Sequence, residues 1–138
     1  ATLAGDLAKG CIPVLLAPLV SDTPWFPGVV AITAFVGHCW SAYLEFRGGK
    51  GVATAAGALL ALSPLVALFT AMVWMVTFLT IKRSSVAALV ATAALPVLAA
   101  WLQPDQLWVC VVLALGVLQR HRDNIDRLLS GYEPPTSS

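Results

Sequence analysis

VATAAGALLALSPLVALFTAMVWMVTFLTI, residues 52–81, is an uncharged stretch that is too long for one upright membrane helix. Ser63 and Pro64 interrupt it, and a proline inside a helix removes a backbone donor and favours a break. The stretch therefore predicts a short helix over Val52–Leu62, followed by a full span over Leu65–Ile81. Two apolar helices in direct succession are typical of a helical membrane protein.

The composition of the chain also favours the bilayer. Hydrophobic residues make up 59% of the 138 residues and charged residues 11%, whereas a soluble domain carries about 25% charged residues. The mean hydropathy is +0.84, and a water-soluble fold of this length could not cover so much apolar surface. A formal net charge of +1 argues against a nucleic-acid partner. Three cysteines lie in apolar stretches without metal-ligand spacing, so we expect them to be buried apolar residues rather than metal ligands: Cys11, Cys39 and Cys110.

Four further apolar runs predict helices: Gly10–Val20, Trp25–Leu44, Ser84–Leu102 and Gln106–Leu118. The second of these has about the twenty residues that a bilayer requires. Pro13 and Pro18 weaken the first run, and Pro96 predicts a kink in the third. We therefore expect an all-α, polytopic membrane fold with about six transmembrane or half-membrane helices. It forms one domain over residues 1–130, and a short disordered tail follows Arg127 and includes residues 131–138.

Basic residues test this division of the chain. They form four groups: Lys9; Arg47 and Lys50; Lys82 and Arg83; and Arg120, Arg122 and Arg127. If each apolar run crosses the membrane once, all four groups fall on one face, which the positive-inside rule makes cytoplasmic. This agreement favours six crossings, with the short helices shielded by their neighbours. The alternative has fewer crossings and places Val52–Leu62 in the interface.

EFRGGKGVAT, residues 45–54, is a basic, glycine-rich run in an otherwise apolar chain. Its glycines allow the backbone to approach a ligand closely: Gly48, Gly49 and Gly51. Arg47 and Lys50 supply positive charge, and the helix expected from Val52 adds its positive N-terminal end. This combination suits a phosphate at the membrane surface. Contact with anionic lipid is the alternative, although it would not require the glycines.

The end of the last span carries a second polar group. His121 and Asn124 are three residues apart and share a helix face, which suits hydroxyl recognition and proton handling. An ordinary interfacial helix with mixed charges is the alternative. Ser84 and Ser85 begin a span, where serines either cap the helix or bind a phosphate oxygen. Glu133 is a carboxylate that could pair with one of the arginines.

Three polar residues nearer the N-terminus allow two interpretations each. His38 lies toward the cytoplasmic end of its span, as either a packing residue or a ligand. Asp6 and Lys9 are three residues apart on one helical face. They form either a simple ion pair or a pair that positions the basic face of a site.

Taken in order, these motifs are GDLAKG (5–10), GHCW (37–40), FRGGKGVAT (46–54), SSVAA (84–88) and HRDNI (121–125). The set resembles the bacterial acyl-phosphate:glycerol-3-phosphate acyltransferases, the PlsY family. Members have seven helices, of which this chain would supply the last six. The family's first signature, a loop rich in Ser, Gly and Asn, should precede Asp6 and is absent. Ser41 stands where the family usually has proline.

The resemblance implies that an acyl group passes from acyl phosphate to the 1-hydroxyl of glycerol 3-phosphate, without a cofactor, at the cytoplasmic face of the bacterial inner membrane. The implied phosphate-binding residues are Gly48, Gly49, Lys50, Gly51, Ser84 and Ser85, with His38 and Arg47 beside them. His121 and Asn124 would orient the glycerol hydroxyls, and either His121 or a substrate phosphate oxygen would accept the proton. Asp6, Lys9 and Glu133 would support the site.

Two other classes of protein remain open from the residues alone. A transporter of anions or small solutes also uses broken helices, but it should carry polar residues through the depth of the bilayer. Here the middles of the spans are Ala, Val and Leu, which favours chemistry at the surface. A structural membrane subunit would leave the glycine-rich run unexplained.

Overall fold

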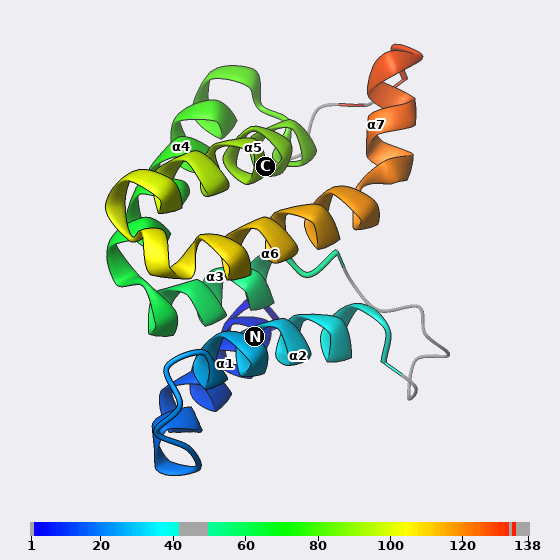
Figure 1. Ribbon diagram of the computed structural model, residues 1–138. Helices are drawn as coiled ribbons and strands as arrows, with labels where there is room; N and C mark the ends of the chain where they lie inside the picture. The colour runs from blue at the N-terminus through cyan, green and yellow to red at the C-terminus, as the bar shows by residue number, and fades with distance from the viewer. Residues whose placement is uncertain (1, 42–49, 133, 135–138) are drawn as a thin grey trace.

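The structure is a computed structural model that describes residues 2–41, 50–132 and 134. Over these residues the fold is all-α, as the sequence predicts (Figure 1). The α-helices are α1 (Thr2–Leu16), α2 (Phe26–Cys39), α3 (Val52–Leu62), α4 (Pro64–Ile81), α5 (Ser84–Leu102), α6 (Leu107–Arg120) and α7 (Arg122–Leu129). Short 3-10 segments, η1 (Ala17–Leu19) and η3 (Pro104–Gln106), follow α1 and precede α6.

Three segments are long and apolar enough to cross a bilayer: Thr2–Leu19, Pro64–Ile81 and Ser84–Leu102. Two shorter apolar helices, α2 and α3, pack among them. Many large apolar side chains face outward, and within α4, which the structure describes completely, Val66 alone is buried. Such a surface is stable in lipid rather than in water, so the helical membrane class is confirmed.

The first helix is longer than the sequence predicts. We expected it over Gly10–Val20, but α1 begins at Thr2 and ends at Leu16. Pro13 lies inside the helix, where it removes one backbone hydrogen bond without ending the helix. Packing of the early turns of α1 against α3 stabilises residues that lie before the apolar run from which the helix was predicted.

Two other boundaries also differ from the prediction. We expected a helix over Trp25–Leu44, but α2 ends at Cys39. The backbone of Trp40 leaves the helical region, with φ −126° and ψ 48°. At the other end of the chain, α7 continues through Leu129, past the point where we expected the tail to begin.

The break within residues 52–81 is confirmed. Helix α3 ends at Leu62 and α4 begins at Pro64, with Ser63 in a non-helical conformation between them. The buried Ser63 hydroxyl donates a hydrogen bond to the side-chain oxygen of Gln103, which caps the C-terminal end of α5. This bond joins the α3–α4 corner to the turn that precedes α6.

Helices α1 and α3 cross with their backbones in contact. A Cβ atom built on Gly10 would lie 2.0 Å from the carbonyl oxygen of Thr54, and one on Gly57 would lie 2.0 Å from that of Leu7. Glycine at both positions therefore permits an approach that any side chain would block. The crossing holds the N-terminal half of α1 beside the first turns of α3.

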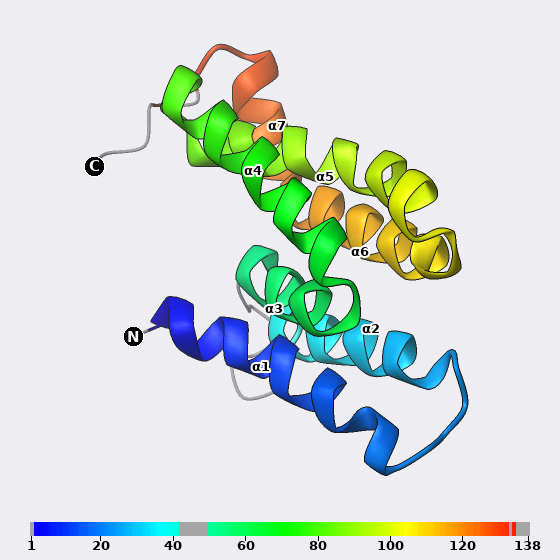
Figure 2. The ribbon, with the colours of Figure 1, turned by 90° about the vertical axis from the view of Figure 1, so that its left-hand side faces the viewer.

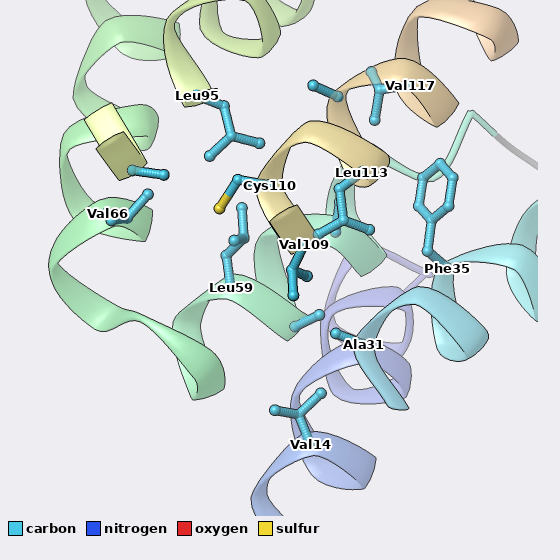
Figure 3. Close-up of a cluster of buried hydrophobic side chains, with 14 of the residues drawn as sticks. Val14, Ala31, Phe35, Leu59, Val66, Leu95, Val109, Cys110, Leu113 and Val117 are labelled. Atoms are coloured by element: carbon cyan, nitrogen blue, oxygen red, sulfur yellow. The ribbon is translucent and has the colours of Figure 1, made fainter. Parts of the chain in front are cut away.

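The buried core lies where α2, α3, α5 and α6 meet. Figure 3 shows Phe35 of α2 and Leu59 of α3 directed toward α6, in the neighbourhood of Leu113.

 Leu95 contacts this cluster from the middle of α5, and Leu113 is fully buried. The cluster sits in the middle of the bundle, so the polar ends of the helices lie away from it.

The turns of the bundle separate into two groups. Figure 2 shows the α1–α2 and α5–α6 connections on the side opposite α7, whereas the beginnings of α3 and α5 and the end of α6 lie on the α7 side. Among the described residues, Lys50, Lys82 and Arg120 belong to this second group. Three of the four predicted basic groups are therefore represented on one side of the bundle. Lys9, which we expected ahead of the first helix, lies instead within α1.

The α1–α3 crossing can be tested with two glycines of the same helix. We expect Gly10→Ala to lower the free energy of unfolding by about 1–3 kcal/mol, because the new methyl group meets the α3 backbone. Gly5→Ala is the matched control, since a Cβ there meets nothing within 4 Å. Thermal denaturation in detergent measures both variants, and equal midpoints would contradict the close crossing.

Candidate active site

A cavity of about 740 Å³ is lined by residues near the beginnings of α3 and α5 and by residues at the α6–α7 junction. Its polar wall combines side chains from separate parts of the chain: Asp6, His38, Lys50, Ser84, Ser85, His121 and Asn124. All of these were candidates from the sequence. The fold therefore gathers residues from α1, α2, α5, α6, α7 and the start of α3 around one space.

Gly51 sets the start of α3. Its φ of +78° lies in the left-handed region that favours glycine, and it occupies the N-cap position. A Cβ at Gly51 would lie 2.3 Å from the Phe35 ring and 2.6 Å from the Cys39 sulfur, so the position has no room for a side chain. Lys50 is exposed beside it, and Val52 and Ala53 of the first helical turn line the cavity. The N-terminal end of α3, which favours anions, thus lies at the cavity wall.

A second helix begins at the same cavity. Arg83 occupies the N-cap position of α5, so Ser84 and Ser85 are the first two residues of the helix. By position, the N-cap residue is thus Arg83 rather than either serine. Both line the cavity, where their hydroxyls lie near the positive end of α5.

His121 and Asn124 are both buried, with exposed fractions of 2% and 3%. The Nδ1 atom of His121 lies 2.8 Å from the carbonyl oxygen of Val117. Because a carbonyl only accepts, Nδ1 donates, and the neutral ring then carries its lone pair on Nε2. Arg122 and Asp123, which lie between them in the sequence, are exposed. In an ordinary interfacial helix the polar side chains would be exposed, so the burial of His121 and Asn124 differs from that alternative.

Asp6 contacts one expected supporting residue, Lys9, and one expected binding residue, His38. Its carboxylate lies 3.2 Å from the Lys9 ammonium and 3.6 Å from Nδ1 of His38. Lys9 is exposed, whereas Asp6 and His38 both line the cavity. The structure thus contains the simple ion pair, and it also places the carboxylate where it can orient an imidazole in the site.

The inner part of the cavity is apolar, and the sequence did not single out its residues. It is lined from four helices by side chains that include Leu59, Ala67, Trp74, Met75, Leu95 and Leu113. Thr70 and Thr92 also face it, but their hydroxyls donate to the carbonyls of Val66 and Ala88 in their own helices. Local sequence does not distinguish an apolar residue that lines a cavity from one that faces lipid, so this part of the site became visible only in the fold.

Several candidates from the sequence lie outside the described residues: Arg47, Gly48, Gly49 and Glu133. Within residues 2–41 and 50–132, no group of three His, Cys, Asp or Glu side chains could hold a metal ion.

The family model for glycerol-3-phosphate acyltransferase matches residues 1–131, nearly the whole chain. The chain belongs to the glycerol-3-phosphate acyltransferase family. It is 49% identical over 138 residues to the glycerol-3-phosphate acyltransferase of Neisseria meningitidis serogroup B, an alignment that covers 96% of this chain and 69% of the relative. It is 46% identical over 132 residues to the protein of the same name from Pseudomonas entomophila, covering 96% of this chain and 70% of that one.

Solved structures give the same result. The chain matches the crystal structure of PlsY (YgiH), described as an integral membrane glycerol 3-phosphate acyltransferase, with a TM-score of 0.89 and 35% identity. The match covers 98% of this chain and 70% of that protein, and the glycerol 3-phosphate form of PlsY aligns equally well. The family resemblance expected from the motifs is confirmed. The acyltransferase interpretation is supported, and the transporter alternative is not.

The steric role of Gly51 can be separated from its backbone conformation. Gly51→Ala introduces both left-handed strain and a clash with Phe35, whereas Gly131→Ala introduces the strain alone, since a Cβ at Gly131 (φ +79°) meets nothing within 4 Å. We expect Gly51→Ala to lower the free energy of unfolding by at least about 2 kcal/mol more than Gly131→Ala does. Thermal denaturation in detergent measures the difference, and its absence would show that the Phe35 contact is loose.

Proposed function

We propose that the chain transfers a fatty acyl group from acyl phosphate to the 1-hydroxyl of glycerol 3-phosphate, giving lysophosphatidic acid and inorganic phosphate. The reaction takes place at the cytoplasmic face of a bacterial inner membrane. One observation carries the proposal: a single cavity joins a polar wall of two helix N-termini, a lysine, a histidine and an asparagine to an apolar interior. Both substrates carry a phosphate, and one also carries an acyl chain.

The polar wall supplies the phosphate site. The first turns of α3 and α5 present backbone N–H groups that have no partner within their own helix, and their helix dipoles favour a negative charge. Lys50 adds a flexible ammonium, and Ser84 and Ser85 add hydroxyls. We assign the glycerol 3-phosphate phosphate to this wall. By resemblance Gly48, Gly49 and Arg47 extend it, and Glu133 holds the C-terminal loop.

His121 and Asn124 handle the acceptor hydroxyl. The hydroxyl oxygen attacks the acyl carbonyl carbon, the bond from that carbon to the phosphate oxygen breaks, and phosphate leaves with the electron pair. The hydroxyl proton passes either to Nε2 of His121 or to a substrate phosphate oxygen. Because phosphate is already a good leaving group, orientation and stabilisation of charge can supply most of the acceleration without a covalent enzyme intermediate. Asp6 holds His38 at the edge of the same wall.

The apolar interior holds the acyl chain. Its walls from α3, α4, α5 and α6 continue directly from the phosphate wall, so one amphiphilic molecule can occupy both parts. Since the hydroxyls of Thr70 and Thr92 are bonded within their own helices, this region offers few polar groups to a solute. Such an interior suits an acyl chain better than a passing anion.

The donor can be tested directly in membranes that contain the chain. We expect acyl phosphate to yield inorganic phosphate and lysophosphatidic acid in equal amounts when glycerol 3-phosphate is present, and little of either without it. Acyl coenzyme A should not replace acyl phosphate. His121→Gln should lower kcat by about 100-fold or more, because it removes the ring that faces the acceptor. Asp123→Asn, at an exposed position, is the control. Release of phosphate at the same rate with and without glycerol 3-phosphate would contradict the proposal.

Lys50 tests the phosphate wall. We expect Lys50→Ala to raise KM for glycerol 3-phosphate by about tenfold or more, since a charged hydrogen bond to phosphate is worth roughly 1.5–3 kcal/mol. Lys82→Asn is the matched control: it removes a basic residue from the same face but outside the cavity wall, and asparagine tolerates the left-handed φ of 61° at that position. An unchanged KM in Lys50→Ala would exclude the ammonium from phosphate binding.

A further inference from the structure

Arg120 and Trp40 form a contact that neither the motifs nor the proposed chemistry requires. The Arg120 guanidinium lies over the Trp40 indole, with its carbon 5.1 Å from the ring centroid. Trp40 is the C-cap residue of α2, and Arg120 is the last residue of α6. The contact therefore joins the ends of two helices that are far apart in the sequence, next to the α6–α7 junction that lines the cavity.

Phe35 continues this contact to the start of α3. The rings of Trp40 and Phe35 meet edge to face, with centroids 6.4 Å apart and planes at 75°. The Phe35 ring in turn fills the space against Gly51 of α3 and Gly116 of α6, where a Cβ would lie 2.3 Å and 2.5 Å from it. A continuous set of contacts therefore runs through Arg120, Trp40 and Phe35 and ends against the backbone of Gly51, beside Lys50. We call it the Arg120 stack.

The other end of the stack is tied to His121. Arg120 directly precedes His121, and the His121 backbone N–H donates to the carbonyl of Val117 at 3.1 Å. The His121 ring donates to that same carbonyl at 2.8 Å. The last turn of α6 therefore fixes Arg120 and His121 relative to each other. None of Arg120, Trp40 and Phe35 belongs to the cavity wall.

We propose that Arg120 is a positioning residue, which acts through Trp40 and Phe35 to hold the Lys50 end of α3 at a set distance from His121. The expected effect of Arg120 on KM for glycerol 3-phosphate rests on the function proposed above. Its effect on the position of the start of α3 does not. Arginine suits this role because its planar guanidinium both carries charge and stacks on an indole face, which the ammonium of lysine does less well.

Hydrogen exchange tests the positioning itself. The Ala55 amide donates to the carbonyl of Gly51 at 2.8 Å, and this bond reports the first turn of α3. With the full chain in lipid nanodiscs, Arg120→Gln and Trp40→Leu should each speed exchange of this amide about three- to tenfold, while Trp40→Phe should change it less. Arg122→Gln, which removes an exposed charge on the other side of His121, is the matched control. Unchanged exchange in both Arg120→Gln and Trp40→Leu would overturn the proposal.

Kinetics then test the consequence for the substrate. Arg120→Gln and Trp40→Leu should each raise KM for glycerol 3-phosphate about three- to tenfold with kcat within about twofold, and the double variant should be no worse than either single one. The coupling would be overturned if the two increases in KM multiplied in the double variant. It would also be overturned if Arg122→Gln raised KM as much as Arg120→Gln does. If the unaltered chain does not use acyl phosphate, the proposed function fails, and the exchange of the Ala55 amide still decides whether the stack positions α3.

Discussion

The backbone contact between α1 and α3 is the constraint on which the rest of the structure depends. Lipid provides little hydrophobic drive for one apolar helix to associate with another, so close packing must supply it. Gly10 and Gly57 permit that packing because each leaves room for a carbonyl of the opposite helix. The crossing holds Asp6 beside the start of α3. Lys50 directly precedes that start, so both residues line the cavity.

In the part of the chain that the structure describes, the polar residues of the cavity lie toward helix ends, apart from Thr70 and Thr92. The middle of the bundle is filled by an apolar cluster around Leu113, and the two threonines that face the inner cavity bond their own helices. Helix beginnings carry backbone N–H groups that the helix itself does not use, and the first residues of α3 and α5 line the outer cavity. The cavity is therefore polar at one end and apolar at the other, which matches the amphiphilic substrates we propose.

Sequence reasoning succeeded where a local signal decided the structure. Pro64 ends one helix and begins the next because its ring cannot continue the first, and the structure places the break there. It failed where distant contacts outweighed such a signal. Pro13 suggested a weak helix, yet α1 runs through it, since packing on α3 compensates for one lost hydrogen bond. The end of α2 at Cys39 was also missed, because Trp40 instead packs against Phe35 and Arg120.

The sequence by itself determined the helical membrane class, the family and the kinds of residue available for binding phosphate and hydroxyl groups, because hydropathy and motif spacing are local properties. Only the tertiary structure decided that His121 and Asn124 are buried, that Ser84 and Ser85 line the same cavity as Lys50, and that this cavity has an apolar interior. It also decided the stack of Arg120 on Trp40. These features depend on how closely the helices approach one another, and that distance is set by small residues and ring packing between segments that are remote in the chain.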